Sequence, residues 1–356
     1  MKKKFLALAL SLTLVVAMTT GCGSTADTAK TAEPAAEETT AVAETEETED
    51  VAEEADTAET DLITIGFSQV GAESDWRVAN TDSMKSALSE ENGFELIFAD
   101  AQQKQENQIK AVRDFIAQDV DVITIAPVTE TGWETVLGEA KDAGIPVIIV
   151  DRMIDVSDDT LYSCWVGSDF KKEGTDAAAW LVNYMKEQGK EGEAQNVVVL
   201  QGTIGSSAEI GRTTGFDEAI KANPEFSVLA EQTGEFTQAK GQEVMESFLK
   251  QYDDIDVVVA QNDNMAFGAI DALKAAGKTP GKDVVIVSFD AVKAAFESMI
   301  AGEMNVSVEC NPLQGPKLAE IVKRVLAEEG IEKFQYMEES VFTAETAAAE
   351  IANRKY

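Results

Sequence analysis

The stretch from Phe94 to Ala126, FELIFADAQQKQENQIKAVRDFIAQDVDVITIA, decides the fold class. It begins with an apolar run at Phe94 to Ala99 and ends with a second run, rich in β-branched residues, at Val122 to Ala126. Between these runs, apolar residues recur at the spacing of one helix face, at Ile109, Val112, Phe115 and Ile116. Continuous apolar strands separated by helices are typical of a parallel sheet covered on both faces. The stretch therefore predicts an α/β fold.

The same alternation continues along the chain on both sides of this stretch. Nine apolar runs predict strands, at Leu62 to Phe67, Phe94 to Ala99, Val122 to Ala126, Val147 to Val150, Val197 to Leu200, Phe226 to Glu231, Val257 to Ala260, Val284 to Val287 and Met304 to Val308. That number exceeds the roughly five or six strands of one doubly wound unit. A polar, irregular stretch from Ile154 to Phe170 interrupts the pattern. We therefore expect two domains that divide near this stretch.

Composition excludes several classes of function. The 356 residues include 65 acidic and 29 basic side chains, which gives a formal net charge of -36. Such a surface repels the phosphate backbone of nucleic acids, so we expect no DNA or RNA partner. The chain has no histidine, and this absence excludes Ser-His-Asp triads, Cys-His dyads and imidazole zinc sites.

The first 21 residues have the pattern of a secretory signal peptide. Three lysines precede an apolar run from Phe5 to Met18, and small residues follow it. The run is shorter than the roughly 20 residues that a membrane-spanning helix needs. Gly21 and Cys22 resemble the bacterial lipobox, in which the cysteine becomes the lipidated first residue, although Thr19 stands where that motif usually has leucine. The alternative is an ordinary signal peptide with an incidental cysteine.

Residues 22–61 predict an acidic tether. Between Gly23 and Asp61 there are 14 acidic residues, one base (Lys30) and no aromatic residue. Such a segment buries too little apolar surface to offset its chain entropy, so we expect disorder. The alternative is a solvated helix, because alanine and glutamate are good helix formers. A disordered tether suits a domain that stands off a membrane on a lipid anchor.

Polar side chains follow most of the predicted strands. These residues are Asp100, Asp151, Arg152, Gln201, Gln261, Asn262, Asp263, Asp290 and Glu309. Ligands of open parallel sheets bind outside the carboxyl ends of the strands. For any single Asp or Asn the alternative is an N-cap of the next helix. Arg152 does not fit that alternative, because a cation opposes the dipole at a helix N-terminus.

The chemistry of these residues indicates a polyhydroxyl ligand. Each sugar hydroxyl donates one hydrogen bond and accepts others, so carboxylates take the protons while arginine and asparagine supply donors. Trp76 offers a flat face for the apolar side of a sugar ring, with simple core packing as the alternative.

At these residues the sequence resembles the ribose-binding branch of the type I periplasmic sugar-binding proteins, and within it the galactofuranose-binding subgroup. The matching segments include IGFSQVGAESDWR at Ile65 to Arg77, DAQQKQENQIKAVRDFIAQDVD at Asp100 to Asp121, DR at 151–152, LQGTIGSSAEIGRTTGF at Leu200 to Phe216, QNDNMAFGAI at Gln261 to Ile270 and SFDAV at Ser288 to Val292. The resemblance covers Leu62 to Phe342.

The resemblance implies two Rossmann-like lobes with parallel sheets, joined by three hinge crossovers. The expected N-terminal lobe comprises residues 62–167 plus 310–334, and the expected C-terminal lobe 168–309 plus 335–356. A sugar would be bound between the lobes by hinge closure.

The resemblance also implies the ligand-binding residues. They are Glu73, Trp76, Arg77, Asp100, Asp151 and Arg152 from the first lobe, and Arg212, Phe236, Asn262, Asp290 and Glu309 from the second. The sequence departs from the ribose binders at Ala126, where they carry Asn, and at Cys310, where they carry Gln. Ribose itself is therefore a poorer candidate than a galactofuranose-like sugar or another small aldose.

The expected function is that of an extracytoplasmic substrate-binding lipoprotein of an ABC-type sugar importer. It would be a monomer, held on the outer face of the cytoplasmic membrane, that passes a monosaccharide to an ABC permease without catalysis. One alternative is a sensor that delivers the sugar to a membrane receptor. A carboxylate glycosidase is another, but neighbouring arginines keep carboxylates ionised, which opposes proton donation. A sugar-responsive repressor would need a basic helix-turn-helix before Leu62, and none is present.

We expect no cofactor and no metal site. The Asp and Asn residues near 253–264 lack the spacing and the glycine of an EF-hand. Cys164 and Cys310 both lie near predicted crossovers, so a hinge disulfide is one alternative and two buried thiols the other.

Overall fold

The structure is a computed structural model that describes residues 62–356. These residues lie within one compact unit. The expected signal peptide at 1–21, the lipidation at Cys22 and the linker at 22–61 lie outside the described residues. No helix of the described part of the chain is long and apolar enough to cross a membrane.

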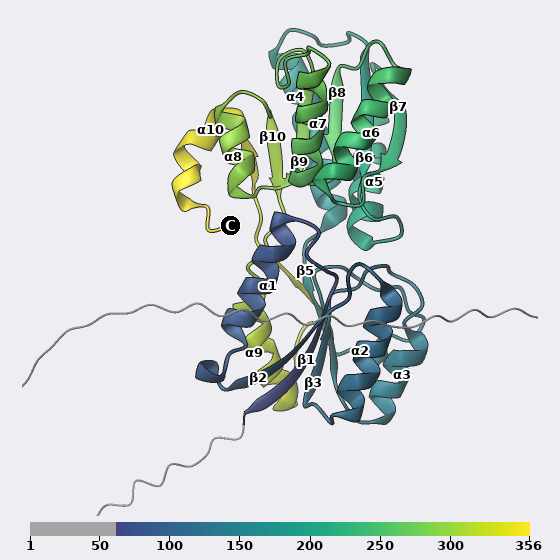
Figure 1. The fold of residues 1–356 in the computed structure, drawn as a ribbon, viewed down its shortest axis with the longest axis vertical. Helices are drawn as coiled ribbons and strands as arrows, with labels where there is room; N and C mark the ends of the chain where they lie inside the picture. Colours follow the sequence, from purple (N-terminus) through teal and green to yellow (C-terminus); the bar gives the residue numbers. More distant parts are fainter. Residues whose placement is uncertain (1–61) are drawn as a thin grey trace, which may run out of the picture. The chain divides into compact units, whose positions relative to one another are not determined.

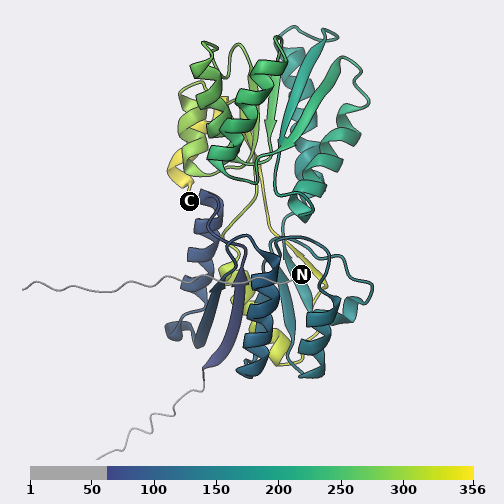
Figure 2. The same cartoon turned by 45° about the vertical axis from the view of Figure 1, so that its right-hand side comes forward.

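The described residues form two α/β lobes, each built around one six-stranded sheet (Figures 1 and 2). The first sheet has the strand order β11-β5-β4-β3-β1-β2, and all its neighbours are parallel. Its strands are β1 (Ile63–Gln69), β2 (Phe94–Asp100), β3 (Val122–Ile125), β4 (Val147–Val150), β5 (Cys164–Gly167) and β11 (Phe334–Tyr336). Its helices are α1 (Asp75–Ala87), α2 (Gln105–Ala117), α3 (Glu134–Asp142) and α9 (Gly315–Leu326).

Apolar residues of both pleats explain why helices cover both faces of this sheet. In β3, Val122 packs in a cluster with Met84 of α1 and Leu318 of α9. The next residue, Ile123, packs in a second cluster with Phe115 of α2. Successive side chains of a strand point to opposite faces, so a continuous apolar run needs cover on both sides. The helical interpretation of the deciding stretch is confirmed.

The second sheet has the order β12-β10-β9-β8-β6-β7, and within it only the β10–β12 pair is antiparallel. Its strands are β6 (Gln195–Gln201), β7 (Phe226–Thr233), β8 (Val257–Ala260), β9 (Val285–Asp290), β10 (Val306–Glu309) and β12 (Val341–Thr343). Helices α4 (Phe170–Glu187) and α5 (Ser207–Ile220) cover one face. Helices α6 (Gln238–Gln251), α7 (Asp263–Ala275), α8 (Lys293–Ile300) and α10 (Ala344–Glu350) lie on the other side.

The chain passes between the lobes three times, as the resemblance implied. The crossovers lie between β5 and α4, between β10 and α9, and between β11 and β12. Strand β11 runs to Tyr336, two residues beyond the boundary expected at 334/335. The last change of lobe therefore falls between Tyr336 and Val341.

The strand prediction missed three elements. Strand β5 lies inside the stretch that we interpreted as irregular, because its four residues, CWVG, are flanked by polar sequence. Strands β11 and β12 have three residues each and lie at the edges of their sheets. Three residues are too few to make an apolar run that the sequence alone reveals.

Candidate ligand cavity between the lobes

Residues of both lobes and of one crossover surround a partly open cavity, whose space together with its opening to solvent is about 280 Å³. It is lined by Glu73, Ser74, Trp76, Arg77, Asp151, Arg152, Phe170, Ala208, Arg212, Phe236, Asn262, Asp290 and Cys310. Asp151 follows β4, Asn262 follows β8, and Asp290 ends β9. The cavity therefore lies at the carboxyl ends of strands from two sheets, where parallel sheets bind ligands.

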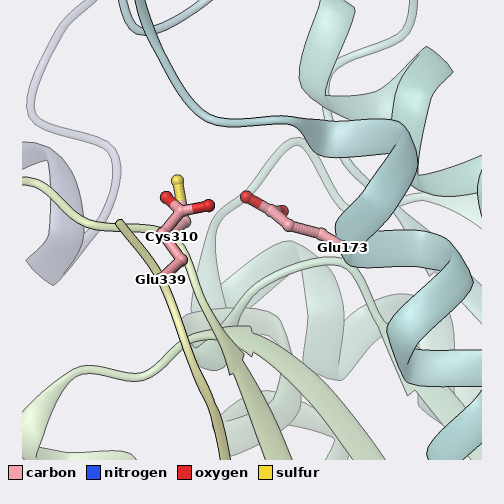
Figure 3. A group of neighbouring side chains, drawn as sticks. All are labelled: Glu173, Cys310 and Glu339. Carbon is pink, nitrogen blue, oxygen red and sulfur yellow. The ribbon is translucent and has the colours of Figure 1, made fainter. Parts of the chain in front are cut away.

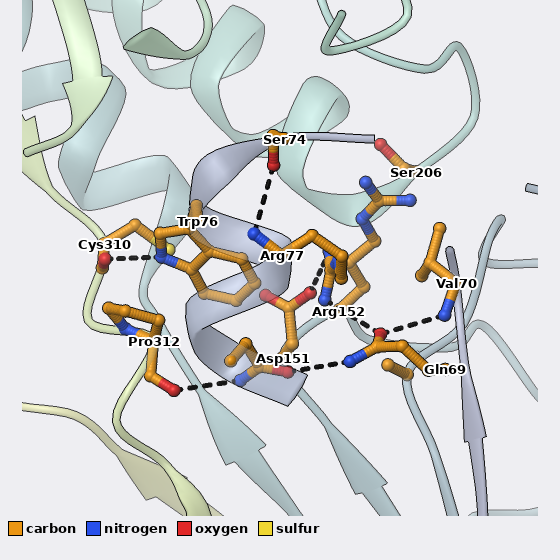
Figure 4. A network of polar contacts seen from close by, with 12 residues as sticks. Gln69, Val70, Ser74, Trp76, Arg77, Asp151, Arg152, Ser206, Cys310 and Pro312 are labelled. Atoms are coloured by element: carbon orange, nitrogen blue, oxygen red, sulfur yellow. Dashed lines mark hydrogen bonds and ion pairs between the residues drawn. The ribbon is translucent and has the colours of Figure 1, made fainter. Parts of the chain in front are cut away.

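The first-lobe wall is a buried network of charges (Figure 4). Arg77 of α1 pairs with Glu73 at 3.0 Å and with Asp151 at 2.7 Å. Arg152 approaches Glu73 at 3.5 Å and donates a hydrogen bond to the Val128 carbonyl. Burial and the neighbouring Arg77 guanidinium lower the pKa of Arg152 to about 10, so it stays charged at neutral pH. Burial opposes ionisation of Glu73, but Arg77 and Arg152 outweigh it and lower the pKa of that carboxyl.

Trp76 joins the lobes as well as lining the cavity. It lies on α1 of the first lobe, yet it packs in a core cluster whose other members belong almost entirely to the second lobe. Its indole Nε1 donates to the carbonyl oxygen of Cys310 at 2.6 Å (Figure 4). The Arg77 guanidinium lies 4.6 Å from its ring centroid. This tryptophan is buried in a core and also lines the cavity, so its position fits core packing, and its role toward a sugar ring stays a prediction.

The second-lobe wall is organised by Arg212 of α5. Its guanidinium pairs with Glu173 at 2.7 Å and with Asp290 at 3.2 Å. It also lies between two aromatic rings, with centroid distances of 5.4 Å to Phe170 and 4.9 Å to Phe289. Cation–π contacts and two ion pairs fix the guanidinium plane. Asp290 has a φ of 98°, a conformation that non-glycine residues rarely adopt and that recurs at functional sites.

Asn262 serves as an N-cap and also lines the cavity. Its Oδ1 accepts from the Met265 amide at 2.9 Å, at the first turn of α7, and its Nδ2 donates to the Phe236 carbonyl at 3.0 Å. Phe236 has a φ of 61°, and its ring packs over Gly202, where an added Cβ would lie 1.9 Å from a ring atom. The Arg152 guanidinium of the first lobe lies 5.0 Å from the centroid of this second-lobe ring.

Direct contacts hold the two lobes together around the cavity. The Asp75 amide donates to Asn264 Oδ1 at 3.0 Å, and the Met153 amide donates to Ser207 Oγ at 2.7 Å. The Glu130 amide donates to the Gly205 carbonyl at 2.9 Å. In each pair the donor belongs to the first lobe and the acceptor to the second. These hydrogen bonds join the two lobes beside the cavity.

Comparison with known proteins assigns the family. Residues 65–330 match the periplasmic binding protein domain. The chain belongs to the periplasmic binding proteins. The galactofuranose-binding protein YtfQ of Escherichia coli is 47% identical over 297 residues, which cover 82% of this chain and 92% of that protein. This relative and the family as a whole are binding proteins. The chain is accordingly a binding protein and not an enzyme.

Two solved structures of this fold are complexes with sugars. One is a Mycobacterium smegmatis protein in complex with β-D-fucofuranose, with 47% identity, a TM-score of 0.80 and coverage of 83% of this chain and 95% of the other. The second is the periplasmic binding protein of the arabinose ABC transporter of Shewanella sp. ANA-3, bound to α- and β-L-arabinofuranose. It has 47% identity, a TM-score of 0.77 and coverage of 82% of this chain and 95% of the other. The two-lobed α/β architecture of this periplasmic binding protein is thus the fold of its relatives.

Nine of the eleven predicted site residues meet in the cavity, and two do not. Asp100 is exposed at the end of β2, where its carboxylate accepts from the Gln102 amide at 2.7 Å. Glu309 pairs with Arg354 at 2.8 Å and accepts from the Tyr356 hydroxyl at 2.9 Å. The chain's C-terminal segment therefore takes up the Glu309 carboxylate and keeps it out of the cavity lining.

Four lining residues were not among the predicted ones. Ser74 is the N-cap of α1, and its hydroxyl accepts from the Arg77 amide, so capping chemistry could have marked it. Phe170 and Ala208 lie at the first turns of α4 and α5, where sequence gives no separate signal. Cys310 was noted as a departure from the ribose binders and as a cysteine near a crossover, but not as a site residue. It and Cys164 are both buried free thiols, so the two cysteines form no disulfide in this structure.

A pH dependence of stability follows from two buried aspartates of the second lobe. Burial raises the pKa of Asp263, and the neighbouring Asp290 carboxylate raises it further. Burial likewise raises the pKa of Asp290, although Arg212 opposes the shift. A carboxyl whose pKa is raised in the folded state binds more protons there than in the unfolded chain. Stability is therefore lost as the pH rises from the ordinary pKa of an aspartate to the raised pKa of the folded state.

We therefore expect the sugar-free protein to melt at higher temperature as the pH falls from about 8 to about 5. Thermal unfolding across this range measures the effect. Asp290→Asn removes one of the coupled carboxyls and should flatten the curve. A melting temperature that falls steadily on acidification over this range would contradict the expectation.

Proposed function

We propose that this protein is the substrate-binding lipoprotein of an ABC sugar importer and that its ligand is a monosaccharide in a furanose form, such as galactofuranose. It is a sugar-binding protein of the ABC transporter type by its relatives. The furanose preference is supported by relatives named for galactofuranose, fucofuranose and arabinofuranose. The observation that carries the proposal is that nine polar and aromatic residues of two lobes meet in one small cavity.

The cavity offers both hydrogen-bond acceptors and hydrogen-bond donors to sugar hydroxyls. Asp151 and Asp290 lie on opposite lobes and supply acceptors, while Arg152 and Arg212 supply donors. The Glu73 Oε2 atom is buried and has no hydrogen-bond partner in the structure, so it too is available to a hydroxyl. A buried acceptor without a partner costs about 1 to 3 kcal/mol, which a correctly placed hydroxyl relieves. A wrong epimer leaves such groups unpaired, and this is the proposed source of selectivity.

Hinge closure is the proposed mode of capture. In the closed conformation Trp76 from the first lobe and Phe236 from the second both line the cavity. The Arg152 guanidinium joins the Phe236 ring across the lobes. A ligand that contacts both lobes favours the closed state over the open state. The closed form would then dock on the permease and release the sugar, with no covalent chemistry.

A thermal-shift panel tests the ligand and its ring form. L-Arabinose can form either ring, 5-deoxy-L-arabinose lacks the oxygen that closes a pyranose, and 4-deoxy-L-arabinose lacks the oxygen that closes a furanose. The two deoxy sugars each lose one hydroxyl and are matched controls. A ligand at about 100 times its dissociation constant adds roughly 2.7 kcal/mol of stability. We expect stabilisation by 5-deoxy-L-arabinose and D-galactose but not by 4-deoxy-L-arabinose; the reverse order would refute the furanose proposal.

The anchor is tested separately from the ligand. The proposal places the mature chain on the outer face of the cytoplasmic membrane through lipid on Cys22. Two acyl chains attached to a protein hold it stably on a membrane, whereas one acyl chain gives only reversible binding. We expect the parent chain to sediment with membranes and Cys22→Ala to be released into the soluble fraction, with sugar binding unchanged. Equal sedimentation of both chains, or an unmodified Cys22 in mass spectrometry, would remove the lipid anchor from the proposal.

A further inference from the structure

Three side chains with metal-binding atoms come together beside the crossovers. Glu173 lies in the first turn of α4, Cys310 follows β10, and Glu339 lies between β11 and β12. One carboxylate oxygen of each glutamate and the cysteine Sγ all lie within 4.8 Å of one another. Figure 3 shows the Glu173 carboxylate pointing toward Cys310 and Glu339. Residues far apart in sequence form this cluster, so it could not be found by spacing.

Only one of the two carboxylate oxygens of Glu173 has a hydrogen-bond partner in the protein. Its Oε2 accepts from the Arg212 Nε at 2.7 Å. Its Oε1 is buried and has no hydrogen-bond partner in the structure, and the side chain is 3% exposed. Buried carboxylate oxygens are almost always hydrogen-bonded or bound to a cation. The free Oε1 therefore indicates a missing partner on the side of Cys310 and Glu339.

The other two side chains are held in place by neighbours. Glu339 Oε1 accepts from the Asn311 amide at 2.9 Å and from the Ser168 hydroxyl. The same hydroxyl lies 3.3 Å from Cys310 Sγ. Hydrogen bonds to one oxygen of a carboxylate orient the other, as the outer partners of metal ligands do. In the described part of the chain, no hydrogen bond uses Glu339 Oε2.

The donor set selects the class of cation. Two carboxylates and a thiolate suit a borderline-soft divalent ion such as Zn²⁺, whereas Ca²⁺ and Mg²⁺ take oxygen ligands. Arg212 is shared between Glu173 and Asp290, so the three ligands, when ionised, carry an excess of negative charge that a divalent cation would offset. A cleft open to solvent reaches Glu173 and Glu339, and its other charged lining residues are Asp169, Asp176, Glu309 and Lys172, which pairs with Asp176.

We propose that Glu173, Cys310 and Glu339 bind a divalent cation of the zinc class, with water as the fourth ligand. Zinc bonds of about 2.0 to 2.3 Å place ligand atoms up to about 4 Å apart, so the three atoms need to move inward by less than about 1 Å. The thiol releases its proton to water as the metal binds. Because the ligands come from α4 and from two different crossovers, the ion would tie together the segments that bend when the lobes move. The cation site adjoins the sugar cavity, because Cys310 lines that cavity and Glu173 pairs with Arg212, but the cation proposal does not depend on which ligand the cavity binds.

Cobalt(II) provides the direct probe, because a Co²⁺–thiolate bond gives a charge-transfer absorption that carboxylates alone cannot give. The full chain with Cys22→Ala retains only Cys164 and Cys310 as thiols and has no histidine. Under reducing conditions we expect this absorption with Co²⁺, its displacement by one equivalent of Zn²⁺, and its loss in Cys310→Ser. Cys164→Ser, which changes the other buried thiol, is the matched control and should keep the absorption.

A second variant keeps the test decisive if Cys310→Ser does not fold. Glu339→Gln retains the thiol and should weaken Zn²⁺ binding at least about tenfold in calorimetry. Absence of the Co²⁺–thiolate absorption in the parent chain would overturn the proposal, as would its persistence in Cys310→Ser. Unchanged Zn²⁺ affinity in Glu339→Gln would overturn it too. Sugar binding is compared in the Cys164→Ser and Glu339→Gln proteins, whose changed residues do not line the sugar cavity, and there it reports separately on the importer function.

Discussion

Replacing Arg212 by alanine is expected to lower the affinity for D-galactose or L-arabinose by about 2 to 5 kcal/mol, roughly 30- to 5,000-fold. The guanidinium lines the cavity and pairs with Glu173 and Asp290, all three of them almost fully buried. Its removal leaves two buried carboxylates without a cation. It also deprives the ligand of the hydrogen-bond donors that the guanidinium supplies. Asp290→Ala should have an effect of the same order, because it leaves Arg212 with one of its two ionic partners.

Isothermal titration calorimetry measures this loss, and two variants separate it from unfolding. Arg212→Lys keeps the charge but not the fork that contacts two carboxylates, so it should fold and bind weakly. Arg113→Ala is the control, because Arg113 pairs with Glu139 at 2.7 Å on the surface, with a side chain 51% exposed. It should bind sugar like the parent. A folded Arg212→Ala protein with parental affinity would show that the cavity is not the sugar site.

Replacing Trp76 by alanine is expected to have the second largest effect. Aromatic anchors at the centre of an interface commonly contribute 2 kcal/mol or more, so we expect affinity to fall at least about 30-fold. Trp76 belongs to the first lobe but packs in the second-lobe core. Its loss would therefore weaken the closed state as well as the contact between the indole and the sugar ring. Truncation of a buried tryptophan also costs about 3 to 5 kcal/mol of stability.

The control for Trp76 is a tryptophan away from the cavity. Trp180 of α4 stacks on Tyr184 with a centroid distance of 4.8 Å and does not line the cavity. Trp180→Ala should lower the melting temperature and leave sugar affinity unchanged, while Trp76→Ala should lower both. Equal affinities of the two variants in calorimetry would remove Trp76 from the proposed site.

Central strands were predictable from sequence because both of their faces are buried. β4 has the predicted bounds Val147–Val150, and β3 differs from its prediction by one residue. β5 was missed because four residues between polar segments do not make a recognisable apolar run. What sequence cannot supply is the order of strands in a sheet, since register and neighbours depend on tertiary packing.

The same limit explains why two of the predicted site residues lie outside the cavity lining. Asp151, Asn262 and Asp290 were found by the rule that ligands bind at strand ends, and they meet in the cavity. Asp100 satisfies that rule too, but β2 is the edge strand of its sheet, so Asp100 lies on the far side of β1 from β3. Glu309 lies outside the lining for another reason, because the last residues of the chain return to pair with it. Neither relation has a local sequence pattern.

The three crossovers have a consequence for biosynthesis. The first lobe is not finished when its first five strands have been made, because α9 and β11 come from residues 315–336, after the whole of the second sheet except β12. Until α9 is synthesised, Phe67 and Val122 lack the cover that Leu318 and Ile321 provide. A nascent chain therefore exposes this apolar face while the ribosome adds most of the second lobe, and that interval is when a chaperone has the most surface to hold.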